Sequence, residues 1–217
     1  QGDRAALHGE NGCGKSTLIK IIADKLLPDS GELEFGYNVA VGYYDQENQN
    51  LDPDNTVLDE LWNCYDDLTE TEIRSALALF LFRGDDIEKK VSVLSGGEKA
   101  RLTLCKLILS RMNLLILDEP TNHLDINSRE ALEHALCEFD GTIIAVSHDR
   151  YFISKLATRI YDLSSHPALD YMGSYEEFLT YKSRLKPTDE SSAEQNVTEA
   201  KEQYLKAKNQ AAEQRKY

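Results

Sequence analysis

The sequence predicts an α/β fold with a core of parallel strands and helices, a helical subdomain within that core, and a helical tail at the C-terminus. The runs "NLLILDEP" and "GTIIAVSHD" are short, apolar and end in polar residues, as parallel strands buried on both faces do. A helical pattern at about 127–139 lies between them, which gives the β-α-β alternation of an α/β core. The stretch from about 56 to 110 contains helical patterns and predicts the subdomain. The 217 residues suffice for one sizeable domain and an appendage.

The first part of the chain predicts a strand, a glycine-rich loop, a helix and two further strands. Residues 5–7 form the short strand that leads into the loop, and the helix runs from Lys15 to Leu27. The stretch "PDSG" that follows predicts a turn. The stretches "ELEF" and "NVAVGYY" then alternate like strands.

The helices of the subdomain are expected at about 56–66 and 69–82, with a third that begins near Gly97. Thr69-x-x-Glu72 at the second helix is a capping-box arrangement. After the core, "PTDESSAEQN" is a polar linker. The start of a C-terminal helix follows, with a weak heptad seam formed by Val197, Ala200, Tyr204, Ala207 and Ala211.

Composition and charge exclude several classes of protein. A net charge of −14 opposes nonspecific binding to nucleic acid, because an acidic body repels phosphates unless its basic contacts are local. No apolar run approaches the roughly 18–20 residues that cross a bilayer, and the chain begins with "QGDR" rather than with a signal peptide. The four cysteines are widely spaced, which favours reduced thiols over disulfides or a metal site. We therefore expect a cytoplasmic protein with no membrane span.

The loop "GENGCGKS" matches the phosphate-binding pattern G-x-x-x-x-G-K-S. Gly9, Gly12 and Gly14 allow backbone N–H groups to converge on phosphate oxygens. Lys15 is expected to neutralise the β- and γ-phosphates, and Ser16 to hold Mg²⁺ through its hydroxyl group. A glycine turn with a chance Lys-Ser is the alternative, but the full pattern between a strand and a helix favours a nucleotide site.

Two carboxylates follow the predicted strand "LLIL". Asp118 at the end of the strand is expected in the Mg²⁺ shell. Glu119 beside it is the candidate to polarise the attacking water, because a carboxylate there can accept a hydrogen bond from it. Taken alone, Asp118 and Glu119 could equally form an acidic turn between a strand and Pro120. Because a phosphate loop precedes them in the chain, the catalytic interpretation is favoured.

Three further features are ambiguous on their own. Ser95-x-x-Glu98 in "LSGGEKARL" is a capping box that starts a helix, and the same serine with the N–H groups of the two following glycines can face a phosphate. His148 in "VSHDR" follows a strand and could donate to a γ-phosphate oxygen, although a histidine in this place is usually structural. Gln46 in "GYYDQE" is equally consistent with an ordinary loop glutamine.

Taken in order, the phosphate loop, Gln46, "LSGGE", "LILDEP", "TNHLD" and "SHDR" resemble the motifs of the nucleotide-binding domain of ATP-binding cassette (ABC) proteins. The resemblance covers about Gly2 to Leu163, and six motifs in one order make it specific. More narrowly, "DEPTNHLDI" with "VSHDRYFI" resembles the ABC-F group, which are soluble twin-cassette proteins, many of them translation or antibiotic-resistance factors at the ribosome. The later "DYMGSYEEFL" is similar to a segment that follows the cassette in that group.

The resemblance implies an ABC-type P-loop NTPase core with ATP and Mg²⁺ as cofactors. It places the cassette at 1–165, its helical subdomain at about 50–110, a strand and a helix at 166–186, and the polar linker with the start of the C-terminal helix at 187–217.

The resemblance also assigns the site residues. Gln46 contacts Mg²⁺ and water, Asp118 is the metal carboxylate, Glu119 is the catalytic base and His148 is the switch histidine. Nucleotide contacts are implied for the phosphate loop, Gly9, Asn11, Gly12, Cys13, Gly14, Lys15, Ser16 and Thr17, and for residues at a cassette interface, Ser95, Gly96, Gly97 and Asp125. The resemblance implies that Ser95, Gly96 and Gly97 close over ATP held by the other cassette.

Two features of the family are missing from the chain. The aromatic residue that stacks on adenine lies on a strand well upstream of the phosphate loop, and only eight residues precede Gly9. Base stacking contributes about 1–3 kcal/mol elsewhere. The second cassette is also missing, so we expect a fragment truncated at both ends, whose ATP site is completed by a partner cassette. The tail "VTEAKEQYLKAKNQAAEQRKY" resembles the helical extension after a second cassette and favours that half. Ribosome or RNA contacts are expected through regions that are not present.

Two other functions compete with this interpretation. The ATPase subunit of an ABC membrane transporter would co-purify with a transmembrane partner, but "TNHLD" and the charged tail argue against it. A DNA-repair or chromosome-structure ATPase would carry a long coiled coil inside the cassette, whereas only about fifty residues separate Gln46 from Ser95. The motifs do not distinguish a translation factor from an antibiotic-resistance factor.

Overall fold

The computed structural model describes residues 2–45, 50–122, 124–165 and 167–185. The strands are β1 Arg4–His8, β2 Val41–Tyr44, β3 Leu114–Asp118, β4 Thr142–Val146, β5 Arg159–Asp162 and β6 Leu169–Met172. The helices are α1 Lys15–Ile22, α2 Val57–Trp62, α3 Glu70–Leu79, α4 Gly96–Leu109, α5 Ile126–Glu138, α6 Arg150–Leu156 and α7 Tyr175–Leu185. Two short 3-10 helices, Gly84–Glu88 and Val91–Val93, connect α3 to α4. The chain forms two units, Gln1–Glu176 and Glu177–Tyr217, and α7 begins in the first of them.

The described strands form one sheet in the order β2-β3-β4-β1-β5-β6. β1 to β5 run parallel to one another, and β6 pairs antiparallel to β5. The carboxyl ends of parallel strands meet at one edge of a sheet, where ligands of open α/β folds bind. This edge brings together the ends of β1, β3 and β4, with Asp118 of β3 opposite Val146 of β4. The predicted α/β architecture is confirmed.

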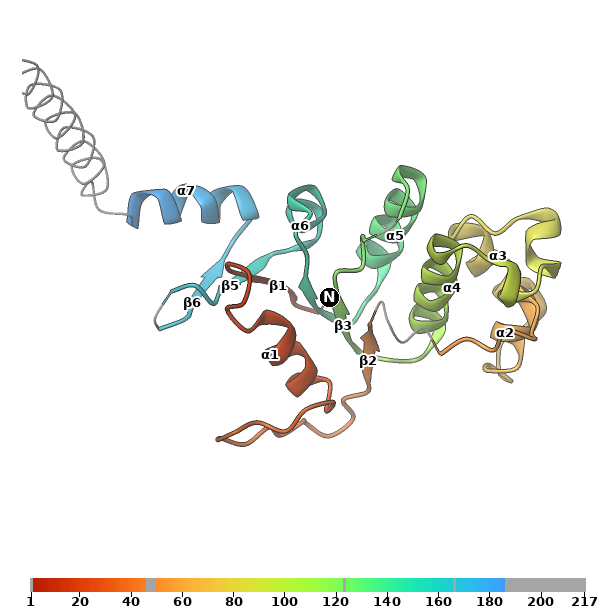
Figure 1. Ribbon diagram of the computed structural model, residues 1–217, viewed down its shortest axis with the longest axis horizontal. Helices are drawn as coiled ribbons and strands as arrows, with labels where there is room; N and C mark the ends of the chain where they lie inside the picture. Colours follow the sequence, from red (N-terminus) through yellow and green to blue (C-terminus); the bar gives the residue numbers. More distant parts are fainter. Residues whose placement is uncertain (1, 46–49, 123, 166, 186–217) are drawn as a thin grey trace, which may run out of the picture. The chain divides into compact units, whose positions relative to one another are not determined.

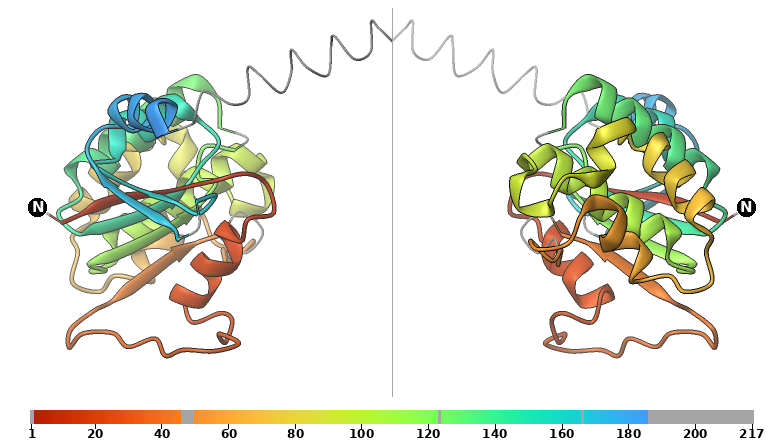
Figure 2. Two further views of the ribbon diagram at one scale, coloured as in Figure 1. Left: turned by 90° about the vertical axis from the view of Figure 1, so that its left-hand side faces the viewer. Right: turned by 90° about the vertical axis from the view of Figure 1, so that its right-hand side faces the viewer.

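Helices cover both faces of the sheet. α1 lies on one face, and α5 and α6 lie on the other (Figures 1 and 2). Ile116 of β3 packs with Ile19 of α1, whereas its neighbours Leu115 and Leu117 belong to the core that includes residues of α4 and α5. Successive strand residues point to opposite faces, so a continuous apolar run serves both layers.

The helices of the expected subdomain are α2, α3 and α4, and α4 packs next to β2 (Figure 1). Thr69 forms the predicted capping box at α3, with its N–H 2.7 Å from Glu72 Oε2. Glu60 of α2 is 2% exposed and accepts a hydrogen bond of 2.6 Å from Lys106 Nζ of α4. It also accepts one of 2.9 Å from Asn55, so this buried carboxylate is fully engaged and ties α2 to α4.

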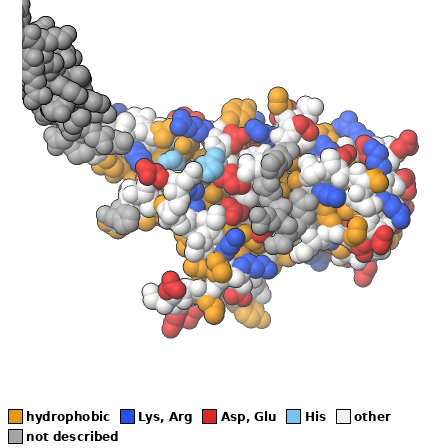
Figure 3. Space-filling model, viewed as in Figure 1, with side chains coloured by type: hydrophobic (Ala, Val, Ile, Leu, Met, Phe, Trp, Pro, Cys, Tyr) orange, Lys and Arg blue, Asp and Glu red, His pale blue; other side chains and the backbone are white. Residues whose placement is uncertain are grey.

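The segment between α1 and β2 differs from the prediction. The stretch "ELEF" is not a strand, α1 ends at Ile22 rather than at Leu27, and β2 begins only at Val41. Alternation alone does not make a strand, because the backbone N–H and C=O groups also need a neighbouring strand, and only Val41–Tyr44 obtain one from β3. Leu27 and Tyr37 are 88% and 97% exposed. Acidic and apolar side chains share the surface of this segment (Figure 3).

The other helices match the predicted positions more closely, although α2 and α3 are several residues shorter than expected. The third helix of the subdomain begins at Gly96, and α5 spans Ile126–Glu138. The polar linker and the heptad seam lie outside the described residues. Among the helices that are described, none combines the length and apolar character that a membrane span requires.

Candidate nucleotide-binding site

The phosphate loop connects β1 to α1 and has the shape of an anion cradle. Gly12 and Gly14 have φ angles of +83° and +97°, in the left-handed region that favours glycine. A Cβ atom at either position would meet no atom within 4 Å, so the loop borders open space on that side. Gly14 precedes α1 without a side-chain cap, which leaves the first N–H groups of the helix without a side-chain acceptor. These N–H groups and the helix dipole suit a phosphate.

Gly9 is required for a different reason. A Cβ atom there would lie 2.6 Å from the Sγ atom of Cys13, in addition to its φ angle of +153°. Cys13 therefore packs against the start of the loop, which explains its place in the loop without any redox chemistry.

Lys15 is the buried cation of the loop. It is 8% exposed, and its Nζ atom donates to the carbonyl oxygens of Gly9 at 2.8 Å and Glu10 at 2.9 Å. Both acceptors are uncharged, so these hydrogen bonds orient the ammonium group without neutralising it. A buried charge of this kind favours an anionic ligand.

The predicted metal ligands of the loop and of β3 lie next to each other. Ser16 Oγ is 3.4 Å from Asp118 Oδ1. Burial raises the pKa of Asp118, and the hydrogen bond from Ser16 opposes that shift. A hydroxyl group and a carboxylate are hard oxygen ligands, and Mg²⁺ commonly binds one or two such protein groups together with substrate phosphates and water. The residues therefore fit Mg²⁺. Gln46, the third predicted ligand, lies outside the described residues.

Glu119 and His148 meet at the ends of β3 and β4. Glu119 has a φ angle of +50°, and its N–H donates to the carbonyl oxygen of Val146 at 2.9 Å. Its Oε2 atom accepts a hydrogen bond of 3.1 Å from the backbone N–H of His148, and its Oε1 atom lies 3.5 Å from His148 Nε2. Burial raises the pKa of Glu119, and the His148 backbone hydrogen bond partly offsets this. The Oε1 atom is buried and, among the described residues, has no hydrogen-bond partner, so it can accept a proton or a water hydrogen bond.

A cavity of about 370 Å³ unites most of these groups. It is lined by Asn11, Gly12, Gly14, Lys15, Ser16, Thr17, Glu119, Val146 and His148. Asp118 does not line this cavity but accepts a hydrogen bond from Ser16, which does. Of the described residues assigned to the phosphate loop, only Gly9 and Cys13 do not line it.

Ser95 and Asp125 do not line the cavity, and neither do Gly96 and Gly97. Ser95 caps α4 through the predicted capping box, in which the Ser95 N–H donates to Glu98 Oε2 at 2.8 Å. The side-chain and backbone hydrogen bonds from Ser95 lower the pKa of Glu98. Asp125 caps α5 and accepts hydrogen bonds from Ser128, which lower its pKa. Both residues are exposed. The chain therefore presents them at its surface rather than to its own phosphate loop.

A link between α4 and the start of α5 escapes sequence reasoning. The Nη1 atom of Arg101 on α4 donates to Ser128 Oγ at 3.0 Å, and Ser128 Oγ donates to Asp125 Oδ2 at 2.9 Å. The Arg101 guanidinium group also lies over the Phe82 ring, 5.2 Å from its centroid. The spacing Asp125-x-x-Ser128 suggests a cap, but nothing in the sequence pairs it with Arg101, because that contact depends on how α4 packs on α5.

Replacement of Arg101 by methionine should lower ATP turnover about fivefold, because coupling contacts of this kind are worth about 1 kcal/mol. The substitution keeps the aliphatic packing but removes the hydrogen bond that ties α4 to the Asp125 cap of α5 through Ser128. Steady-state kinetics of the assembled protein should show a lower kcat with an unchanged KM for ATP. Arg74→Met on α3, which breaks an exposed pair with Glu70, is the matched control. Equal turnover of both variants would refute the positioning role.

The family model with the description "ABC transporter" matches residues 1–122, which is more than half of the chain. The "Putative ATP-binding protein YdiF" of Bacillus subtilis (strain 168) is 56% identical over 182 residues, covering 84% of this chain and 28% of that protein. "ABC transporter F family member 5" of Arabidopsis thaliana is 45% identical over 181 residues, covering 82% of this chain and 26% of that protein. The chain thus spans about a quarter of the length of these relatives.

Solved structures share the fold. "RNase-L Inhibitor" superposes with a TM-score of 0.63 at 23% identity, covering 84% of this chain and 37% of that one. A dimeric ATP-binding cassette in a post-hydrolysis state with ADP and Pi gives a TM-score of 0.60 at 22% identity, covering 74% of this chain and 80% of that one. From the family model and the relatives together, the chain belongs to the ABC transporter family and is a nucleotide-binding domain of its ABC-F group.

Proposed function

We propose that this cassette binds ATP with Mg²⁺ at the phosphate loop and hydrolyses it, and that a second cassette completes the site. The observation that carries the proposal is the placement of Glu119. Glu119 lines the same cavity as Lys15 and Ser16, and its buried Oε1 atom, 3.5 Å from His148 Nε2, has no hydrogen-bond partner among the described residues.

The residues of the loop bind the polyphosphate. The Lys15 ammonium group, oriented by two carbonyl oxygens, neutralises the β- and γ-phosphates, and the N–H groups at the start of α1 contact the phosphate oxygens. Ser16 and Asp118 hold Mg²⁺, which supplies positive charge to the phosphate oxygens when bound. Asn11 and Thr17 line the cavity beside them, and Gln46 completes the metal and water contacts in this proposal.

Glu119 orients the attacking water. Its backbone is fixed by the bond to Val146, and its Oε2 atom is held by the backbone N–H of His148, so that Oε1 remains for the water. Glu119 accepts the water hydrogen bond in its ionised form, as a general base does. The His148 imidazole lies at the same cavity and donates a hydrogen bond to the γ-phosphate.

The exposed Ser95 and Gly96, together with the half-buried Gly97, support a composite site. They stand at the start of α4, where a Cβ atom at Gly96 would meet no atom within 4 Å, yet they do not line the cavity of their own chain. We infer that they close over ATP held by another cassette and that this chain's ATP needs the corresponding residues of that cassette. Asp125 lies at the interface in this arrangement. ATP bound between the two cassettes then favours a closed state, and hydrolysis releases it.

We further propose that the parent protein is cytoplasmic and acts at the ribosome, in translation or antibiotic resistance. The support is the resemblance of "DEPTNHLDI" and "VSHDRYFI" to the ABC-F group. With its net charge of −14, the chain is poorly suited to bind ribosomal RNA by itself, so RNA contacts belong to other regions of the parent protein. The tail sequence favours the second cassette of that protein.

Ser95→Asp in the two-cassette protein tests the composite site. Aspartate keeps a good N-cap for α4, but its carboxylate faces the γ-phosphate of the opposite cassette, so turnover should fall at least about tenfold. Thr69→Asp in the matching capping box of α3 is the control and should leave turnover unchanged. The isolated chain should bind ATP but turn it over slowly. Rapid turnover by the isolated monomer, or no effect of Ser95→Asp, would overturn the composite site.

A further inference from the structure

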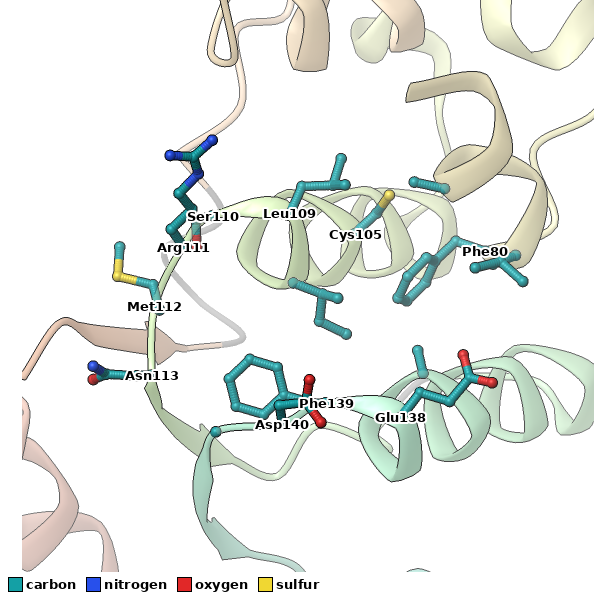
Figure 4. Close-up of a pocket in the computed structure, with 15 residues that line it drawn as sticks. Phe80, Cys105, Leu109, Ser110, Arg111, Met112, Asn113, Glu138, Phe139 and Asp140 are labelled. Carbon is teal, nitrogen blue, oxygen red and sulfur yellow. The ribbon is translucent and has the colours of Figure 1, made fainter. Parts of the chain in front are cut away.

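A groove of about 550 Å³ lies between α3, α4 and α5 and is larger than the nucleotide cavity. It is formed by the C-terminal ends of these three helices and the residues that follow α4 and α5 (Figure 4). The groove and the nucleotide cavity share no lining residue. It is therefore a separate feature of the same unit, and we call it the α3–α5 groove.

The interior of the α3–α5 groove is apolar. Phe80 after α3 and Phe139 after α5 point into the gap between α4 and α5 (Figure 4). Leu79 lies on its rim and is 53% exposed. The Phe139 ring holds its position because Gly141 lacks a side chain, since a Cβ atom there would come within 2.4 Å of Phe139 Cε1. The groove offers ordered aromatic walls and an exposed leucine, as anchor-binding surfaces do.

The charge at the mouth of the groove is negative. Glu138 and Asp140 are exposed and line it. Arg111 also lines it, but its guanidinium group is paired with Asp67. Buried Arg4 caps the carbonyl oxygens at the end of α5 from within the fold. Among the described residues, the carboxylates of Glu138 and Asp140 therefore remain to meet a partner. The one ion pair recorded for them there joins Glu138 to His134, at 3.7 Å.

We propose that the α3–α5 groove binds a helix of a partner protein that presents apolar side chains flanked by Lys or Arg. A volume of this size accepts several aliphatic side chains spaced along one face of a helix. The carboxylates of Glu138 and Asp140 select a cationic flank and disfavour an acidic helix. Charge complementarity thus defines the chemistry of the occupant.

A helix bound in the groove contacts α4 and α5, the two helices that begin next to residues proposed for the cassette interface. α4 begins directly after Ser95, and α5 begins directly after Asp125. The partner helix contacts the opposite ends of these same helices. It therefore docks on the side of the helical layer that leaves Ser95 and Asp125 accessible to a second cassette.

The two methionines of the chain provide a direct test by ¹³C-methyl NMR. Met112 lines the groove, whereas Met172 lies in β6, is 76% exposed and lines no part of it. The probe is a synthetic amphipathic helix of Leu and Lys, and its twin carries Glu in place of Lys. The Leu/Lys peptide should shift the Met112 methyl signal and leave that of Met172 in place. The Leu/Glu peptide should not shift either.

Variants separate specific docking from general attraction to an acidic protein. Leu79→Lys and the double variant Glu138→Lys/Asp140→Lys should each raise the Kd of the Leu/Lys peptide roughly tenfold. Val93→Lys, at a 70% exposed position outside the groove, and Glu130→Lys, on the exposed surface of α5, should leave it unchanged. Equal binding of the Leu/Glu peptide, equal shifts of both methionines, or equal effects of groove and control variants would overturn the proposal. So would a Met112 signal that shifts with protein concentration alone, since the occupant would then be a second copy of the chain.

Discussion

Glu119→Gln in the two-cassette protein should lower the rate of ATP hydrolysis by about 10²–10³-fold, as loss of a general base does. Glutamine retains an oxygen that can accept the backbone N–H of His148, which Glu119 Oε2 accepts at 3.1 Å, so the shape of the site is kept. Lys15 and Ser16 are unchanged, and ATP affinity should therefore be nearly unaltered. Single-turnover hydrolysis and the Kd of a fluorescent ATP analogue measure the two quantities separately.

Glu10→Gln is the matched control for this variant. Glu10 belongs to the same loop, is exposed, and contributes only its backbone carbonyl to Lys15.

The Glu119→Gln protein should also trap ATP and remain on ribosomes in co-sedimentation, which tests the ribosomal part of the proposal. Normal turnover with normal release by the variant would contradict the role of Glu119, whereas trapped ATP without ribosome retention would contradict only the ribosomal role.

The pH profile gives a second signature of the same group. Burial raises the pKa of Glu119, and the base acts in its ionised form. Turnover of the unaltered protein should therefore begin to fall, as the pH is lowered, at a higher pH than the usual glutamate pKa of about 4.3 would give. The residual turnover of Glu119→Gln should lack this acidic limb.

Lys15→Ala should weaken ATP binding by roughly 10²-fold, which corresponds to the loss of about 3 kcal/mol from charge-assisted hydrogen bonds. The ammonium group is held at 2.8 and 2.9 Å from two uncharged carbonyl oxygens beside the cavity, so its charge is directed to the phosphates rather than to a protein carboxylate. Isothermal titration with ATP and Mg²⁺ measures the affinity. The effect should be smaller for AMP, which lacks the β- and γ-phosphates.

Lys20→Ala is the control, because Lys20 lies on the same helix and does not line the nucleotide cavity. It should bind ATP like the unaltered chain, and circular dichroism should show that both variants are folded. An ATP affinity of Lys15→Ala within a factor of about three of the unaltered value would show that the loop is not the phosphate site.

The parts of the site that the sequence predicts are those set by local rules. The glycine positions follow from left-handed backbone angles at Gly12 and Gly14, and the capping boxes at Thr69 and Ser95 follow from a three-residue spacing. The parallel core follows from apolar runs such as "LLIL", because strands buried on both faces lack alternation. In each case, a few neighbouring residues contain the information.

What the sequence does not predict depends on partners distant in the chain. The stretch "ELEF" has the alternation of a strand but no neighbouring strand in the described chain. The contact of Arg101 with Ser128 and the bond from the His148 N–H to Glu119 join residues that are 27 and 29 positions apart. Such contacts arise from the order of strands in the sheet and the packing of α4 on α5, which no local pattern specifies.

In the role proposed for Glu119, stability and catalysis oppose each other. A glutamate with a φ angle of +50° is strained by about 1–3 kcal/mol relative to a regular backbone, and its Oε1 atom is buried without a hydrogen-bond partner in the described structure. Because the pKa of Glu119 is raised, the folded state binds the proton more tightly than the unfolded state does. The free energy of unfolding therefore falls as the pH rises through the folded pKa and Glu119 ionises. It recovers as the pH falls and Glu119 is protonated. Glycine or asparagine would relieve the backbone strain and the charge burial together. A descendant cassette released from selection for hydrolysis should therefore drift toward these residues at position 119 and gain stability by losing its chemistry.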